Sequence, residues 1–150
     1  DRNGNQDEDG ILQSVGDLRK LIDRELDRGI PQKKIIIAGF SQGGAIAIYT
    51  ALTLASELGG LIALSTYMPL EKKFTDLAKN SNKIQSSKLP IFFAHGSYDP
   101  VIPLSYGEKT KSFIEQFGYT VDWNEYPIEH SVSQREIEDI GQWISRVLEL

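Results

Sequence analysis

A serine with small neighbours stands between two apolar runs and is the residue best placed to do chemistry. Residues 39–43 read Gly-Phe-Ser-Gln-Gly, a G-x-S-x-G pattern with Ser41 at its centre. The apolar run 35–38 predicts a strand before it, and the alanine-rich run 44–48 predicts a helix after it. A tight turn between strand and helix strains the serine backbone and lifts its hydroxyl above the sheet. We therefore predict Ser41 to be a nucleophile.

The pattern by itself is a weak signal, since roughly 0.05 occurrences are expected by chance in a chain of this length. Its context strengthens it. A serine hydroxyl needs a base that takes its proton and a third group that orients the base, and residues of both kinds follow Ser41 in the chain.

Two histidines are candidates for the base. His95 closes the apolar run 91–94, and a histidine at a strand end often serves as a structural hydrogen-bonding group. His130 follows the last predicted strand on a loop, where ligands are handled in open α/β sheets. The order serine, acid, histidine also favours His130 as the base. The alternative is that His130 is an ordinary surface histidine.

Three aspartates between the nucleophile and the base could be the acid: Asp76, Asp99 and Asp122. Asp99 is favoured because it lies in a turn directly after a buried strand, near where the catalytic loops should converge. Asp76 lies in a polar segment and Asp122 points outward from an alternating strand, as solvated charges do. The alternative for Asp99 is an ordinary turn aspartate before Pro100.

The elements that must position these residues alternate between helix and strand. Strands are predicted at 34–40, 61–65 and 89–94, with a half-exposed strand at 119–126. Helices are predicted at 11–28, at 42–57, within 71–88 (a short helix with a loose loop), from Pro103 to Gly118, and along the C-terminal apolar positions 137–148. Residues 1–10 are predicted to be a flexible end. This order indicates an α/β fold with a mostly parallel sheet, right-handed crossovers and helices on both faces.

Composition narrows the classes of function. The 150 residues fit one domain, and the net charge of -5 is spread without a basic cluster, which argues against nucleic acid or an anionic membrane as partner. No cysteine is present, so thiolate chemistry and disulfides are excluded, and two histidines are too few for a His-rich metal site. We predict no cofactor and no metal. No apolar run approaches the ~20 residues of a membrane span and no secretory signal is visible, so a cytoplasmic location is predicted.

Four segments in this order resemble one known family. They are residues 39–44 (GFSQGG), 64–69 (LSTYMP), 95–103 (HGSYDPVIP) and 126–130 (YPIEH). Together they resemble the acyl-protein thioesterase, lysophospholipase and carboxylesterase family of α/β-hydrolases, from Ile11 to the end of the chain. The resemblance implies Ser41 as nucleophile, Asp99 as orienting acid and His130 as base. It also implies the backbone N–H of Gln42 as one oxyanion donor.

The resemblance implies a carboxylic ester or thioester as substrate, cleaved through an acyl-enzyme, with a lipid or an acylated protein as the carrier of the acyl group. The apolar segment 66–70 follows a strand end, so Tyr67 and Met68 are predicted to help to line the acyl site. The alternative for this segment is ordinary loop packing. A homodimer is compatible with these features.

The chain departs from the family at its start. Family members carry several earlier strands and a loop that supplies a second oxyanion donor, and nothing ahead of Ile11 resembles that loop. We predict that residues 1–150 are the C-terminal two-thirds of a longer hydrolase domain. The alternative from another class is a non-catalytic α/β binding module or an inactive fragment. A nucleotide-binding Rossmann domain is disfavoured, because the glycines at 39, 43 and 44 do not fit G-x-G-x-x-G.

Overall fold

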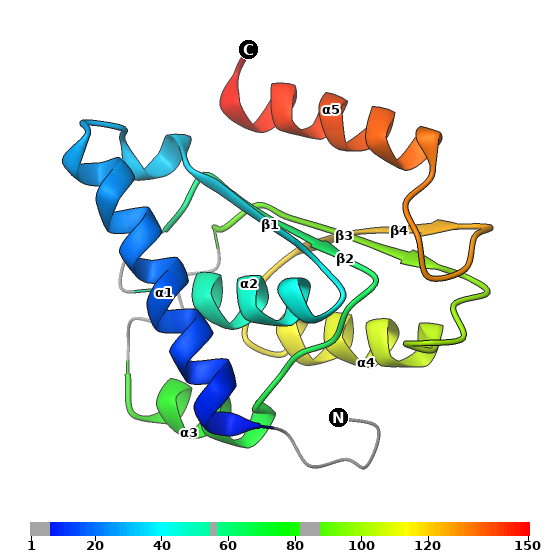
Figure 1. Cartoon of the computed structure of the whole chain (residues 1–150), viewed down its shortest axis with the longest axis horizontal. Helices are drawn as coiled ribbons and strands as arrows, with labels where there is room; N and C mark the ends of the chain where they lie inside the picture. Colours follow the sequence, from blue (N-terminus) through cyan, green and yellow to red (C-terminus); the bar gives the residue numbers. More distant parts are fainter. Residues whose placement is uncertain (1–6, 55–56, 82–87) are drawn as a thin grey trace.

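A parallel sheet of four strands forms the centre of the molecule (Figure 1). The structure, a computed structural model, describes residues 7–54, 57–81 and 88–150. The strands lie side by side in chain order: β1 (Ile36–Phe40), β2 (Gly60–Leu64), β3 (Ile91–Gly96) and β4 (Val121–Tyr126). The predicted parallel sheet is confirmed. Because the strands are parallel, the loops after all four of them emerge at the same edge.

Five α-helices surround this sheet among the described residues. They are α1 (Glu8–Asp27), α2 (Gln42–Thr53), α3 (Glu71–Lys79), α4 (Leu104–Glu115) and α5 (Gln134–Leu148). In Figure 1, α5 lies on one side of the sheet, and α1, α2 and α4 lie on the other. No helix in the described ranges is both long enough and apolar enough to cross a membrane.

Two hydrophobic clusters, one on each face, hold these layers together. The larger cluster joins strand residues such as Leu61 and Phe93 to Ile48 of α2. The smaller cluster docks α5 through Trp143, whose ring meets Phe92 edge to face with centroids 5.8 Å apart. Both faces of the inner strands are therefore covered, which explains their continuous apolar sequence.

The N-terminal end differs from its prediction. Residues 8–10 were expected in a flexible end but form the first turn of α1. The carboxylate of Asp7 accepts a hydrogen bond from the backbone N–H of Gly10 at 3.0 Å and so caps this helix. Glu8 and Asp9 in the first turn also complement the helix dipole. The remainder of the predicted flexible end, residues 1–6, lies outside the described part.

Helix α2 ends at Thr53 rather than at residue 57. Leu54 has an extended backbone, and Arg19 of α1 donates to the carbonyl and to the hydroxyl of Thr53 at 3.3 and 2.7 Å. A contact with another helix thus satisfies the end of α2. Residues 55–56 of the predicted helix lie outside the described residues, as do residues 82–87 of the predicted loose loop.

All four strands differ from their predicted bounds by one or two residues at one end or both, and two of the differences matter here. β1 begins at Ile36, because Gln32–Lys34 form a 3-10 turn where the strand was expected to start. β3 runs to Gly96, so His95 lies inside the strand instead of beyond it. His95 is only 1% exposed.

Glu136, in the first turn of α5, is a buried carboxyl with an expected effect on stability. It is 1% exposed, its Oε1 has no hydrogen-bond partner among the described residues, and its Oε2 accepts from the N–H of Ser133. Burial raises the pKa of Glu136, and the Ser133 N–H offsets this only in part. The folded state therefore keeps this proton to a higher pH than the unfolded state, and stability falls as pH rises through the raised pKa.

We expect Glu136→Gln to raise the free energy of unfolding at pH 8, because the amide can still accept from Ser133 and carries no buried charge. The gain should vanish at about pH 3, where the wild-type carboxyl is protonated in both states. Urea unfolding of both proteins at the two pH values measures this. The control is Glu138→Gln, at an exposed site on the same helix. A Glu136→Gln protein less stable than wild type at pH 8 would contradict the expectation.

Candidate active site

The turn at Ser41 has the strained geometry predicted for it. Ser41 has φ 54° and ψ −122°, and it stands at the N-cap of α2 without capping the helix through its side chain. A Cβ added at Gly39 would meet the backbone of Gly43, and one added at Gly44 would come within 2.7 Å of the Thr66 side chain. Only glycines allow this close approach of strand, turn and helix. The turn thus leaves the serine hydroxyl free for another partner.

The last residue of β2 and a threonine just after it hold the nucleophile in place. The backbone N–H of Ser41 donates to the carbonyl of Leu64 at 2.9 Å, which extends the pairing of β1 with β2 by one residue. The hydroxyl of Thr66 donates to the carbonyl of Ser41 at 2.6 Å, and Thr66 is fully buried. Both the backbone N–H and the backbone carbonyl of the strained residue are therefore hydrogen-bonded. Sequence reasoning missed this role of Thr66, which has no local signature.

The loops after β3 and β4 are bonded to each other. Gly96 pairs with Tyr126 at the ends of the two strands. Beyond them, the N–H groups of Ser97 and Tyr98 donate to the carbonyls of Tyr126 and Ile128 at 2.8 and 3.1 Å. These bonds bring an aspartate three residues past β3 and a histidine four residues past β4 to the same place.

Ser41, Asp99 and His130 form one hydrogen-bonded chain. Nε2 of His130 lies 3.0 Å from Oγ of Ser41, and Nδ1 of His130 lies 2.7 Å from Oδ2 of Asp99. The Asp99 side chain is fully buried and that of His130 is 17% exposed. The structure thus brings together the three side chains that the sequence pointed to as nucleophile, acid and base.

Asp99 is anchored by its other oxygen. Oδ1 accepts from the N–H groups of Val101 and Ile102 at 2.8 and 2.9 Å. Burial alone would raise the pKa of Asp99, but hydrogen bonds from His130, Ile102 and Val101 outweigh it and hold the pKa below its usual range. An ionised Asp99 only accepts, so Nδ1 of His130 carries the proton and Nε2 is free to accept from the serine hydroxyl.

Phe40 supports the base from the side of the nucleophile. Its ring lies 4.7 Å from the His130 ring, centroid to centroid, with the planes tilted by 43°. Phe40 is the variable residue of G-x-S, directly before Ser41. The end of β1 therefore positions both the nucleophile and an aromatic ring that packs against the base. The pattern gave no sign of this contact, because it leaves that position open.

The backbone N–H of Gln42 occupies the first helical position of α2. The first N–H groups of a helix have no carbonyl partner within it, and the helix dipole adds partial positive charge there. An N–H in this position, next to the serine hydroxyl, can stabilise an oxyanion. The role of Gln42 as an oxyanion donor, which the family resemblance implies, stays a prediction.

The other candidates lie elsewhere. Asp76 is exposed on α3, and Asp122 is exposed on β4 with a carboxylate oxygen 3.5 Å from the Arg146 guanidinium. Tyr67 is half-buried, whereas Met68 is 3% exposed and belongs to the larger hydrophobic cluster. The position of Met68 fits the loop-packing alternative, and a role for Tyr67 and Met68 at the acyl site stays a prediction.

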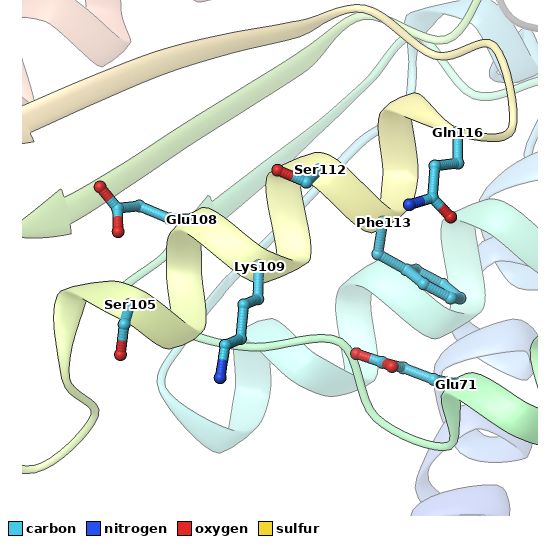
Figure 2. A pocket seen from close by; sticks show the side chains of 7 residues that line it. All are labelled: Glu71, Ser105, Glu108, Lys109, Ser112, Phe113 and Gln116. Atoms are coloured by element: carbon cyan, nitrogen blue, oxygen red, sulfur yellow. The ribbon is translucent and has the colours of Figure 1, made fainter.

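A pocket of about 480 Å³ lies along α4 (Figure 2). Glu71 lines it from the start of α3, and the α4 side, with Gln116 just after it, contributes mostly polar side chains, Lys109 and Glu108 among them. None of the three triad residues contributes to it. The described part of the chain contains no group of three or more His, Asp or Glu side chains suited to a metal ion.

Comparison with known proteins places the chain in a family. A model of the phospholipase/carboxylesterase family matches residues 1–148. Acyl-protein thioesterase 1 of Neurospora crassa is 39% identical over 145 residues, covering 96% of this chain and 58% of the Neurospora protein. The Yarrowia lipolytica protein of that name is 39% identical over 145 residues, covering 95% and 62%. The chain thus spans about three fifths of the length of these curated relatives.

Solved structures agree with this assignment. Arabidopsis thaliana SOBER1 has a TM-score of 0.87 to this structure at 28% identity, covering 99% of this chain and 69% of the SOBER1 chain. Acyl-protein thioesterase 2 of Zea mays has a TM-score of 0.85 at 21% identity, covering 96% and 67%, and shows the shared fold. From its sequence match and its fold, the chain belongs to the phospholipase/carboxylesterase family of α/β-hydrolases.

Proposed function

We propose that the protein hydrolyses carboxylic esters or thioesters with Ser41 as nucleophile, Asp99 as orienting acid and His130 as base. The observation that carries the proposal is the hydrogen-bonded chain from Asp99 through His130 to Ser41. The family membership supports the reaction class. The strained backbone of Ser41 supports its role, since such strain is commonly stored at functional sites.

The reaction follows from the hydrogen-bond directions. Nε2 of His130 takes the hydroxyl proton while Oγ of Ser41 attacks the acyl carbon, and the carbonyl oxygen becomes an oxyanion near the N–H of Gln42. The histidinium then gives its proton to the departing alcohol or thiol, leaving an acyl-enzyme. Nε2 of His130 then takes a proton from a water molecule, whose oxygen attacks the acyl carbon. As the bond from that carbon to Oγ of Ser41 breaks, the histidinium returns the proton to Oγ, and the carboxylic acid leaves.

The buried carboxylate makes these proton transfers easier. His130 gains a positive charge in each transition state, and the ionised Asp99 lies 2.7 Å from its other nitrogen. Two backbone N–H groups hold the Asp99 carboxylate still, so little reorganisation is needed when the charge appears.

We further propose a thioester on an acylated protein as the substrate class, because the relatives named above are acyl-protein thioesterases. A lipid ester would be attacked by the same three groups. Within the segment 66–70, Tyr67 is half-buried and the other four residues are buried, so Tyr67 is the residue of this segment that we propose to contact the acyl group. We also propose that the chain is the C-terminal two-thirds of a longer hydrolase domain, in which an earlier loop supplies the second oxyanion donor.

The test is labelling of the protein with a fluorophosphonate, followed by intact mass measurement and peptide mapping. We expect one adduct, on Ser41, and none in a Ser41→Ala control. The intact mass also gives the length of the protein. A well-folded protein that takes up no label would favour the alternative, a non-catalytic binding module.

A further inference from the structure

The second histidine of the chain lies next to the acid and is not used in the proposed mechanism. His95 is fully buried in β3, and its Nε2 lies 2.8 Å from the carbonyl oxygen of Ile102 and 3.8 Å from Oδ2 of Asp99. Burying a polar ring without hydrogen bonds is costly. The hydrogen bond from His95 to Ile102 offsets part of that cost, and it also ties the ring to the loop that carries Asp99.

The direction of that bond is determined by the surroundings. The Ile102 carbonyl only accepts, so Nε2 of His95 must be the donor. Nδ1 of His95 has no partner among the described residues, and it faces Gly107, where an added Cβ would come within 2.6 Å of it. A proton on Nδ1 would have no acceptor there, so the ring carries its hydrogen on Nε2.

The ring itself is held rigidly. It packs beside the rings of Phe93 and Trp123, with centroid distances of 6.5 and 6.3 Å and interplanar angles of 19° and 21°, and those two rings contact each other at 5.1 Å. Gly107 of α4 allows this packing, since any side chain there would collide with the imidazole. The donor at Nε2 is thus a fixed point on the central sheet.

Ile102 connects this fixed point to the acid. Its carbonyl accepts from His95, and its N–H donates to Oδ1 of Asp99 at 2.9 Å. One residue is therefore bonded on one side to the sheet and on the other to the carboxylate that orients His130. Pro103 follows at the N-cap position of α4, so the same loop leads directly into that helix.

We propose that His95 is a positioning residue that holds the loop 96–103, through Ile102, in the conformation that presents Asp99 to His130. It touches no reacting atom and acts through the acid. This inference rests on the proposed function for its kinetic consequence, but the geometry of the loop can be tested without any substrate.

The test compares His95→Leu, which removes the donor, with His95→Gln, whose amide N–H can reach the position of Nε2. The control is Phe92→Leu, a substitution of a fully buried residue of the same strand that lies on the opposite face and packs against Trp143. With a short p-nitrophenyl ester we expect kcat of His95→Leu to fall about 10²-fold with KM nearly unchanged, as for a small misplacement of a catalytic group. His95→Gln and Phe92→Leu should stay within about threefold of wild type.

The substrate-free readout is NMR of the imidazole rings, which is simple because the sequence has two histidines. In the wild type we expect His95 to carry hydrogen on Nε2 alone and His130 to show a far-downfield proton between Nδ1 and Asp99. His95→Leu should lose that downfield proton to exchange, and His95→Gln should keep it.

Three results would overturn the proposal: a proton on Nδ1 of His95 in the wild type, a downfield proton and kcat retained in His95→Leu, or His95→Gln as impaired as His95→Leu. If His95→Leu does not fold, the proposal is judged by two other results: the position of the His95 hydrogen in the wild type, and the kcat and downfield proton of His95→Gln. A protein that takes up no fluorophosphonate and cleaves no ester would refute the proposed function, and the NMR result would still judge the role of His95.

Discussion

Replacing Ser41 with alanine is expected to lower kcat by about 10⁴- to 10⁶-fold, because the nucleophile is lost while His130 and Asp99 stay in place. Alanine keeps the Cβ that the strained turn already accommodates, so the backbone cost at φ 54° is unchanged. The hydroxyl of Ser41 does not cap α2, and its removal therefore takes no bond from the helix. The free energy of unfolding should stay close to that of wild type.

Steady-state hydrolysis of a p-nitrophenyl ester and a chain-matched thioester measures the loss. The control is Ser131→Ala, which removes an exposed hydroxyl from the loop that carries His130. Wild-type turnover in a folded Ser41→Ala protein would show that another group attacks the ester, and the assignment of the nucleophile would then be abandoned.

Replacing Asp99 with asparagine is expected to lower kcat by about 10⁴-fold through the tautomer of the base. The N–H groups of Val101 and Ile102 bond one side-chain oxygen, so the asparagine carbonyl must face them and its NH₂ must face His130. Nδ1 of His130 would then have to accept a hydrogen bond and leave the proton on Nε2. A ring protonated on Nε2 cannot take the proton of Ser41.

Fluorophosphonate labelling rates and ester turnover of Asp99→Asn should fall together, while the exposed Asp122→Asn control should match wild type. Acid unfolding gives a second readout. Because its folded pKa is held low, Asp99 contributes stability above the pKa of the unfolded state, about 3.9, and that contribution is lost as pH falls through the folded value. The free energy of unfolding of Asp99→Asn should therefore fall less than that of wild type as pH is lowered through this range. Normal turnover in the folded variant would exclude Asp99 as the orienting acid.

The fold class was predictable because the burial of a strand or helix is visible in the spacing of its own apolar residues. Strands covered on both faces are continuous apolar runs, and the run from 91 to 94 lies in β3, an inner strand of the parallel sheet that is buried along its whole length. The ends of elements were less predictable. The end of α2 depends on Arg19, which comes 34 residues before Thr53, and the start of α1 depends on a single capping carboxylate, Asp7.

The candidate site divides in the same way. Ser41 was predictable because strand, turn and helix are contiguous in the sequence and the glycines that permit the turn are its neighbours. The choice of Asp99 over Asp76 and Asp122 rested on expected strand ends, and its contact with His130 spans 31 residues. The roles of these residues in catalysis stay predictions that the labelling and kinetic experiments test.

By itself, the sequence determined the alternation of helices and strands, the segment that forms the nucleophile turn and the family that the motifs resemble. Only the tertiary structure decided that the loops after β3 and β4 are bonded together, that Phe40 packs on the base, and that His95 is a buried donor to the acid loop. The physical reason is that periodicity records the environment of each residue along the chain. The partner of a side chain depends instead on strand order and register, and no short window of sequence contains both strands.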